Sequence, residues 1–244
     1  MESPGIADRT RGPASLSGDS EHPRAVRSFV TRGGRITPAQ ERALEELWPK
    51  YGIELGEAPL DLDALFGARG RRVAEIGFGN GEHLLALAAS RPADHFLGIE
   101  VHRPGVGRLL LQLKERDLTN VRVICRDAVE VLERHLQGAC LDEILILFPD
   151  PWPKKRHHKR RLLQQPFVAL LAERLRGGGA LRLATDWEPY AAEMLAALAA
   201  EPRLRNMAPS GGFVPRPAER SPTRFERRGE RLGHKVWDLE FRRR

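Results

Sequence analysis

The sequence predicts an α/β fold in which a mostly parallel sheet is doubly wound, with helices on both of its faces. Five short apolar segments have the length of buried strands, and helical patterns alternate with them from residue 71 onward. Alternation at this spacing is typical of βαβ units. The chain has 244 residues, of which 41% are hydrophobic, so it is long enough for one such domain with extensions.

Each predicted element corresponds to a stretch of sequence. The strands are RVAEI (72–76), HFLGIE (95–100), VRVIC (121–125), EILILF (143–148) and ALRLAT (180–185). The helices between them cover residues 82–90, 104–116, 128–136, 162–176 and 189–200. An earlier helix begins where Thr37 places a capping hydroxyl before Pro38, and it runs to about Leu47. Residues 213–241, which include VWDLEF (236–241), could add late strands.

The amino-terminal residues and the cysteines indicate the setting of the protein. Residues 1–26 are rich in Gly, Pro, Ser and charge, which predicts a disordered leader before a domain over residues 27–244 that begins with a helical extension. No apolar signal-peptide core is present, and the longest apolar runs are too short to cross a bilayer. The two cysteines, Cys125 and Cys140, fit a reduced cytoplasmic setting without a disulfide framework or a metal cluster.

Acidic side chains lie at or near the carboxyl ends of all five predicted strands. They are Glu75, Glu100, Asp127, Asp150 and Asp186. In an open α/β sheet, ligands bind in the crevice outside these strand ends. Asp and Glu are rarely buried without partners, so packing alone does not explain five of them. We therefore expect a ring of carboxylates around one crevice.

A glycine-rich loop follows the first strand. Gly77, Gly79 and Gly81 form G-x-G-x-G, and glycines allow a tight turn and a close approach of a ligand to the backbone. The dinucleotide fingerprint is G-x-G-x-x-G, so the third glycine comes one residue early. Glu75 and Glu82 also place negative charge where a pyrophosphate would bind. These features favour a ligand with a cationic amino group and a sulfonium, such as S-adenosylmethionine.

Two of the strand-end acids extend this site into a predicted adenosine pocket. Glu100 lies 19 residues past Gly81, close to the spacing of a carboxylate that binds ribose hydroxyls. Asp127 could accept a hydrogen bond from the adenine amino group. It also precedes a helical segment, so a helix N-cap is an alternative interpretation.

Basic residues are concentrated in two parts of the chain, whose net charge is +7 and whose pI is about 10.0. Residues 154–161 carry six Lys and Arg, and residues 216–244 carry ten. The first cluster directly follows Trp152, whose ring offers a face on which a base could stack. Positive charge at a helix N-terminus opposes the helix dipole. A phosphate-binding role therefore explains the cluster better than a solvated helix start, and it predicts a nucleic-acid partner.

Five segments together resemble the bacterial tRNA (guanine-N7-)-methyltransferase family. They are EIGFGNGEHLL, GIEVHRPGVGRLL, FPDPWPKKRHHKRR, TDW and TRFERRGERLGHKVWDLEF. The resemblance extends from about Arg27 to residue 241, and its third and fifth segments are specific to that family. It implies a Rossmann-like class I methyltransferase fold with seven strands. It also implies methyl transfer from S-adenosylmethionine to N7 of guanosine 46 in the variable loop of tRNA, with no metal and no stable protein partner.

The resemblance assigns roles position by position. The cofactor-binding residues are Glu75, Glu100, Asp127 and Asp150, beside the loop glycines Gly77, Gly79 and Gly81, and Asp150 is also the expected catalytic residue. The substrate-binding residues are Lys154, Asp186, Thr223, Arg224, Phe225 and Glu226. The RNA-interacting residues are Arg156, His157, His158, Lys159, Arg160 and Arg161.

The chemistry of guanine suggests how these residues act. Guanine N7 has an in-plane lone pair and no proton, so no general base is required. The purine becomes cationic as the methyl group transfers, and we expect Asp150 to orient the base and stabilise that charge. Asp186 and Glu226 could accept hydrogen bonds from the guanine N1–H and amino group. The local sequence also allows an N-cap for Asp186 and a surface salt bridge for Glu226.

Three other functions are compatible with parts of the sequence. An NAD-dependent oxidoreductase requires the other glycine spacing. A methyltransferase acting on a different RNA base or on an exocyclic amino group typically has Asp or Asn followed by Pro-Pro-aromatic, which Asp150-Pro151-Trp152 matches in part. A catalytically inert RNA-binding module would not need the complete set of strand-end acids.

Overall fold

The computed structural model describes residues 27–29, 35–67, 70–220, 226 and 235–244. The predicted leader (1–26) and the predicted substrate residues Thr223, Arg224 and Phe225 lie outside these ranges. Within the described part of the chain, no helix is long and apolar enough to cross a membrane. Cys125 and Cys140 are both free thiols.

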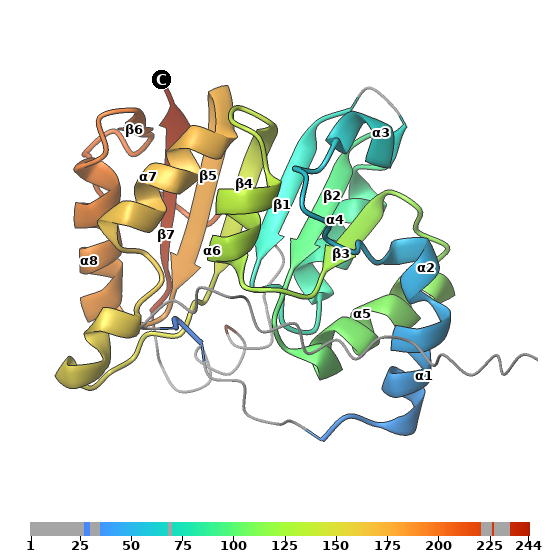
Figure 1. The fold of residues 1–244 in the computed structure, drawn as a ribbon. Coiled ribbons are helices and arrows are strands. Elements are labelled where there is room, and N and C mark those ends of the chain that lie inside the picture. Colours follow the sequence, from blue (N-terminus) through green and yellow to red (C-terminus); the bar gives the residue numbers. More distant parts are fainter. Residues whose placement is uncertain (1–26, 30–34, 68–69, 221–225, 227–234) are drawn as a thin grey trace, which may run out of the picture.

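A seven-stranded sheet forms the centre of the molecule (Figure 1). Its strands are β1 (Arg72–Ile76), β2 (His95–Ile99), β3 (Val121–Ile124), β4 (Leu141–Leu147), β5 (Leu175–Thr185), β6 (Leu204–Asn206) and β7 (Trp237–Arg243). Their order in the sheet is β3-β2-β1-β4-β5-β7-β6. Strands β1 to β5 are parallel, and β7 runs antiparallel to both β5 and β6. The α/β prediction with a mostly parallel seven-stranded sheet is confirmed.

Helices cover both faces of the sheet and bury one apolar cluster on each side. One cluster is formed with α6 (Ala128–Glu130), the π-helix Val131–His135, α7 (Gln165–Arg174), α8 (Glu188–Ala199) and α3 (Leu62–Phe66). The other is formed with α4 (Glu82–Ser90), α5 (Arg103–Glu115), α1 (Pro38–Glu46) and α2 (Trp48–Tyr51). Both faces of the sheet are therefore covered, and the loops that follow the carboxyl ends of the strands carry most of the predicted site residues.

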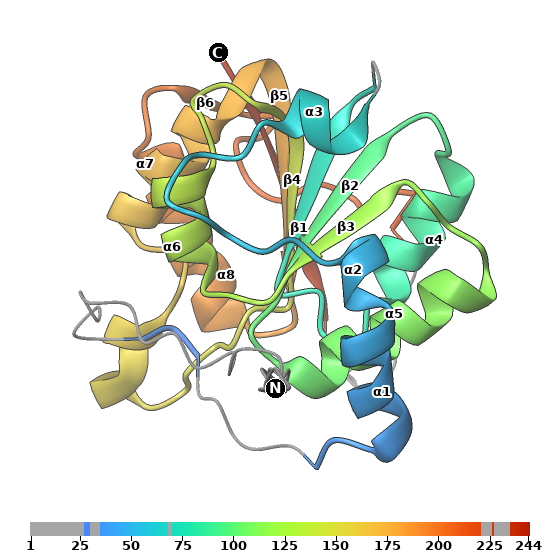
Figure 2. The ribbon, with the colours of Figure 1, turned by 45° about the vertical axis from the view of Figure 1, so that its right-hand side comes forward.

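The amino-terminal helix α1 lies beside α5 and extends the second helical layer (Figure 2). Thr37 and Gln40 form a reciprocal capping box at its start, as the predicted capping hydroxyl required. Gly107 in α5 permits the contact, because an added Cβ would lie 2.7 Å from the carbonyl oxygen of Gln40. The helical extension is therefore packed onto the domain.

Most predicted bounds differ from the structure by a few residues, and three differences change an element. Strand β5 begins at Leu175 rather than 180, because Leu175 pairs with Leu141 ahead of a register shift. The single helix predicted over 128–136 is a short α-helix followed by a π-helix. Strand β6 has only three residues and was not predicted, whereas the late strand expected at 236–241 is confirmed as β7.

Candidate active site at the carboxyl edge of the sheet

The glycine loop after β1 turns the chain through three left-handed residues. The φ angles are +73° at Gly77, +57° at Gly79 and +76° at Gly81. A Cβ added at Gly81 would lie 2.6 Å from Cδ1 of Leu109, so this glycine is required for packing against α5. A Cβ added at Gly77 or Gly79 would meet nothing within 4 Å. These two glycines therefore border open space in which a ligand can approach the backbone.

Glu100, directly after β2, is held by three backbone amides. Oε2 accepts a hydrogen bond from the Gly79 amide at 2.8 Å. Oε1 accepts from the amides of Val101 at 2.7 Å and His102 at 2.9 Å. The carboxylate thus ties the glycine loop to the end of β2, and its orientation is fixed by backbone rather than by flexible side chains.

Glu75 is the most enclosed of the predicted cofactor acids. It lies in β1 immediately before the glycine loop, and only 3% of its surface is exposed. Its Oε2 is 3.0 Å from Nδ1 of His83, a buried residue in the first turns of α4. His83 therefore holds the Glu75 carboxylate from within the domain. This pairing could not be predicted, because a lone histidine in a helix carries no recognisable signal.

Asp127 caps the helix that follows β3. Its Oδ1 accepts a hydrogen bond from the Val129 amide at 3.0 Å, and its backbone is extended, as expected of an N-cap residue. The capping interpretation is therefore confirmed. A contact between Asp127 and adenine would be an additional role for this side chain.

Asp150 lies on an exposed loop between two residues with unusual backbone angles. After β4 ends, Phe148 has φ +52°, and Trp152 has φ +45°. Left-handed conformations of bulky residues are costly and are enriched at functional sites. The Phe148 amide donates to the Ala184 carbonyl at 2.8 Å, which fixes the start of the loop against β5. The loop leaves β4 at the carboxyl edge of the sheet, where the neighbouring parallel strand β1 leads into the glycine loop.

Trp152 connects this loop to two other segments. Its indole Nε1 donates to the carbonyl oxygen of Ser28 at 3.2 Å. The Cζ atom of Arg160 lies 5.1 Å from the centre of the ring, and the His157 ring meets it edge-on with centroids 5.7 Å apart. The ring that the sequence suggested for base stacking therefore already contacts Arg160 within the protein.

All of the predicted RNA-interacting residues except Arg161 lie in a 3₁₀ helix, Lys155–Arg160, which has no buried side chain. Lys155, Arg156 and Lys159 are exposed. Gln164 fixes the end of this helix, since its Nε2 donates to the carbonyl oxygens of Lys159 at 2.8 Å and Arg161 at 3.0 Å. The charges of the segment thus lie at the surface on an anchored backbone.

Arg161 differs from the rest of the predicted RNA-interacting set. It is only 4% exposed, its Nε donates to the Pro151 carbonyl at 2.8 Å, and its guanidinium pairs with Glu193. Its Cζ lies 4.9 Å from the ring centre of Tyr190, and burial raises the pKa of that tyrosine to about 12. The prediction of direct RNA contact is therefore not supported by the position of Arg161, which instead joins the basic helix to α8.

The predicted substrate side is completed by Asp186 and Glu226. Asp186 is half-buried after β5, and Trp187 rather than Asp186 occupies the N-cap position of α8. Glu226 is 1% exposed and pairs with Arg220 through both oxygens, at 2.5 and 2.9 Å. The surface salt bridge considered for Glu226 is therefore wrong, because this ion pair is buried. Among the described residues, no group of His, Cys, Asp or Glu is arranged to hold a metal ion.

Comparisons with known proteins agree with this architecture. Residues 69–239 match the family described as "Putative methyltransferase". A tRNA (guanine-N(7)-)-methyltransferase of Leifsonia xyli subsp. xyli is 58% identical, over 88% of this chain and 95% of its own length. Proteins of the same name from Stutzerimonas stutzeri and Ralstonia nicotianae are 52% and 56% identical, over 96% and 91% of this chain and 98% and 88% of their own lengths.

Solved structures with low sequence identity share the fold. The antibiotic-resistance methyltransferase Kmr superposes with a TM-score of 0.54 at 14% identity, over 78% of this chain and 94% of its own. An antibiotic-related methyltransferase superposes with a TM-score of 0.50 at 16% identity, over the same shares of the two chains. The sequence relatives are similar enough to decide the family. The chain belongs to the tRNA (guanine-N7-)-methyltransferase family and has the fold of class I methyltransferases.

Proposed function

We propose that this protein transfers a methyl group from S-adenosylmethionine to N7 of guanosine 46 in the variable loop of tRNA. The observation that carries the proposal is the arrangement of one edge of the sheet. The glycine loop and Glu100 follow β1 and β2, and Asp150 and the basic 3₁₀ helix follow the adjacent strand β4. A cofactor site after β1 and a polyanion site after β4 would therefore adjoin, because β1 and β4 are neighbouring strands.

The residues at the cofactor end fit S-adenosylmethionine. The open space beside Gly77 and Gly79 admits a ligand against the backbone. Glu100, fixed by three amides, would accept hydrogen bonds from the ribose hydroxyls, and Asp127 would accept from the adenine amino group. Glu75 would contribute negative charge toward the methionine ammonium. The bound cofactor would supply an electrophilic methyl group on a sulfonium sulfur.

Asp150 is suited to supporting the guanine rather than to removing a proton. The lone pair on N7 is available without deprotonation, so catalysis reduces to orientation and charge stabilisation. Asp150 is exposed after β4 and would face the purine as it becomes cationic. Asp186 and Glu226 would accept hydrogen bonds from the N1–H and the amino group, a donor pattern that adenine does not offer.

The basic 3₁₀ helix would hold the RNA backbone. Lys154 precedes it, and its exposed lysine and arginine side chains can neutralise phosphates and release bound counterions. Because the helix begins five residues after Asp150, phosphate contacts there would bring a neighbouring base to the crevice. The proposal includes a reduced cytoplasmic setting, because tRNA is found there.

A labelling experiment tests the proposal. The protein is incubated with methyl-labelled S-adenosylmethionine and a tRNA transcript, and the RNA is digested to nucleosides. We expect label in 7-methylguanosine, and its loss when guanosine 46 of the transcript is replaced by adenosine. Label in an exocyclic N-methyl nucleoside would instead support the alternative methyltransferase. Binding of tRNA without any label would support the inert RNA-binding module.

A further inference from the structure

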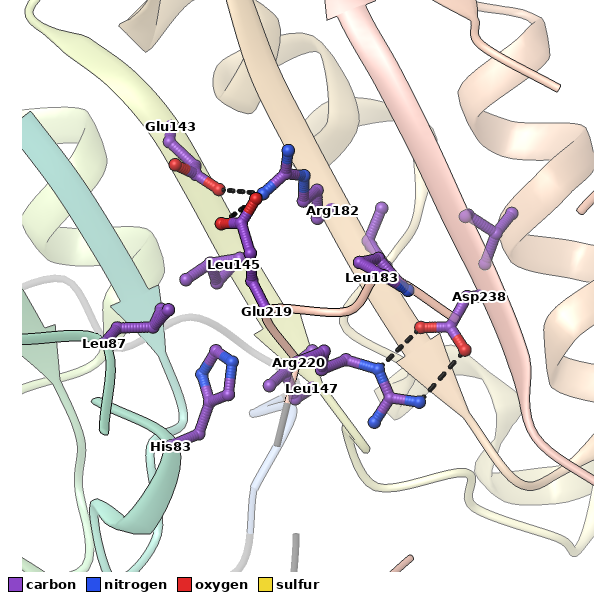
Figure 3. A pocket seen from close by; sticks show the side chains of 12 residues that line it. His83, Leu87, Glu143, Leu145, Leu147, Arg182, Leu183, Glu219, Arg220 and Asp238 are labelled. Atoms are coloured by element: carbon purple, nitrogen blue, oxygen red, sulfur yellow. Dashed lines mark hydrogen bonds and ion pairs between the residues drawn. The ribbon is translucent and has the colours of Figure 1, made fainter. Parts of the chain in front are cut away.

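A buried arginine joins the last strand to the proposed guanine site. Arg220 is 5% exposed and lies in the pocket between α4 and strands β4, β5 and β7 (Figure 3). Its Nε donates to Oδ1 of Asp238 at 2.7 Å, and its Nη2 donates to Oδ2 at 3.0 Å. Asp238 belongs to β7 and pairs in register with Ala184, two residues before Asp186. Arg220 is therefore fixed to the rigid sheet close to the carboxyl end of β5.

The same guanidinium also binds Glu226 along a second edge. Nη1 donates to Oε2 of Glu226 at 2.5 Å, and Nη2 donates to Oε1 at 2.9 Å. All three side chains are at most 5% exposed. Burial alone would lower the pKa of Arg220, but hydrogen bonds to Glu226 and Asp238 outweigh it and raise that pKa. One planar cation thus holds two carboxylates in fixed geometry, which the single point charge of lysine cannot reproduce.

Arg220 also contacts the loop that carries Asp150. Its Cζ lies 5.7 Å from the ring centre of Phe148, the left-handed residue at the start of that loop. A second arginine, Arg216, is 3.4 Å from Glu226 and also donates to the Arg220 carbonyl oxygen. The arginine therefore contacts Glu226, β7 and the Asp150 loop at once.

Stability alone does not account for such a network. Buried ion pairs can often be replaced by apolar residues of similar volume at no cost in stability, because desolvation offsets the attraction between the charges. A network of this kind is better suited to fixing where a carboxylate points. Arg220 occupies one lone pair on each oxygen of Glu226 and so sets the direction in which this carboxylate can accept a further hydrogen bond, such as one from the guanine amino group.

We propose that Arg220 is a positioning residue, which fixes the Glu226 carboxylate against β7 so that it can distinguish guanine from other bases. Asp238 accepts hydrogen bonds from the other edge of the guanidinium, formed by Nε and Nη2, and balances part of the positive charge of Arg220. The inference rests on the proposed function, in which Glu226 accepts hydrogen bonds from the guanine.

A double-mutant cycle tests the inference. Arg220→Lys, Glu226→Gln and the double variant are assayed with tRNA carrying either guanosine or inosine at position 46, because inosine lacks the amino group. In the wild-type background, we expect Arg220→Lys to raise KM for tRNA about tenfold. It should leave KM for S-adenosylmethionine unchanged and reduce the preference for guanosine over inosine. In the Glu226→Gln background, the same change should have an effect of less than about twofold, because the two residues act as a unit.

The matched control is Arg182→Lys. Arg182 lines the same pocket and pairs with the buried Glu143 at 2.7 Å (Figure 3), whereas Arg220 pairs with Glu226. The Arg182→Lys variant should keep the preference of the wild-type protein for guanosine over inosine. If Arg220→Lys does not fold, Asp238→Asn serves instead, since it keeps the side-chain shape and loosens the hold on Arg220.

The outcomes separate the inference from the proposed function. Equal effects of Arg220→Lys in both backgrounds, or an unchanged preference for guanosine over inosine, would overturn the positioning role while the wild-type protein still forms 7-methylguanosine. If the wild-type protein forms no 7-methylguanosine, the proposed function fails, and the inference fails with it.

Discussion

The two halves of the candidate site are held together in different ways. In the cofactor half, Glu100 and Asp127 accept hydrogen bonds from backbone amides. Except for the Gly79 amide, these amides lie within a few residues of the carboxylate that they bind. In the substrate half, contacts between distant side chains predominate. Arg161 reaches Glu193, and Arg220 reaches Asp238.

This difference follows from what each half would have to bind. A small cofactor needs a preformed cradle, and backbone amides provide it with little loss of side-chain entropy. A large polyanion needs surface charge, which must stay hydrated and exposed until the RNA binds. We therefore expect substitutions in the first half to change cofactor affinity or stability, and substitutions in the second half to change tRNA binding.

The largest expected effect is on the rate of methyl transfer, through Asp150, which we assign to the boundary between the two halves. Asp150→Asn should lower kcat at saturating tRNA and cofactor by about 10²–10³-fold, because the neutral amide no longer stabilises a cationic purine. Single-turnover methylation measures this rate, and unchanged affinities for both substrates serve as the control. A variant with full kcat would show that Asp150 has no electrostatic role.

Two glycines of one loop allow the cofactor half to be divided further. Gly79→Ala and Gly81→Ala both place a side chain at positive φ, which costs about 1–2 kcal/mol. Gly81→Ala should lose about 1–3 kcal/mol more stability because its Cβ meets Leu109, as denaturant unfolding would show. Gly79→Ala should instead weaken S-adenosylmethionine binding, because its Cβ enters the open space. Equal losses of stability in the two variants would contradict this division.

In the substrate half, the exposed basic residues and the buried Arg161 are expected to respond differently to substitution. Replacing Lys155, Arg156 and Lys159 by Gln should weaken tRNA binding and reduce the salt slope of log K by about 0.7–0.9 per lost phosphate contact. Arg161→Gln should lower the unfolding temperature and leave the salt slope unchanged, because Arg161 is buried against Tyr190. Binding titrations over a range of salt measure both slopes. An unchanged slope in the triple variant would remove these residues from the interface.

The smallest expected effect is on pH dependence. Partial burial, together with the charges of Arg156 and Arg160, lowers the pKa of His157 below its usual value. The imidazole therefore gains its charge at a lower pH than an ordinary histidine does. We expect tRNA affinity to rise a few-fold as acidification charges His157, by one added phosphate attraction. His157→Gln should flatten this rise, and a wild-type affinity that falls with acid would contradict the assignment.

The cofactor half could be predicted from the sequence far more completely than the substrate half. Strand β1 and the glycine loop have local signals, namely an apolar run and closely spaced glycines, and the structure places both where they were expected. The burial of Arg161 has no local signal, because its partners Tyr190 and Glu193 lie about thirty residues away. The same holds for Glu226, whose pairing with Arg220 looks like an ordinary surface pair until the fold buries it.

The division between the halves is tested most directly by crossed binding titrations on two variants. Glu100→Gln replaces a carboxylate that accepts three amide hydrogen bonds, and the triple Gln variant at Lys155, Arg156 and Lys159 removes exposed charge. We expect the Kd for S-adenosylmethionine to rise at least about tenfold in the first variant only, since an amide cannot satisfy the same donors. The Kd for tRNA should rise in the second variant only. A folded variant in which both Kd values rise together would contradict the account.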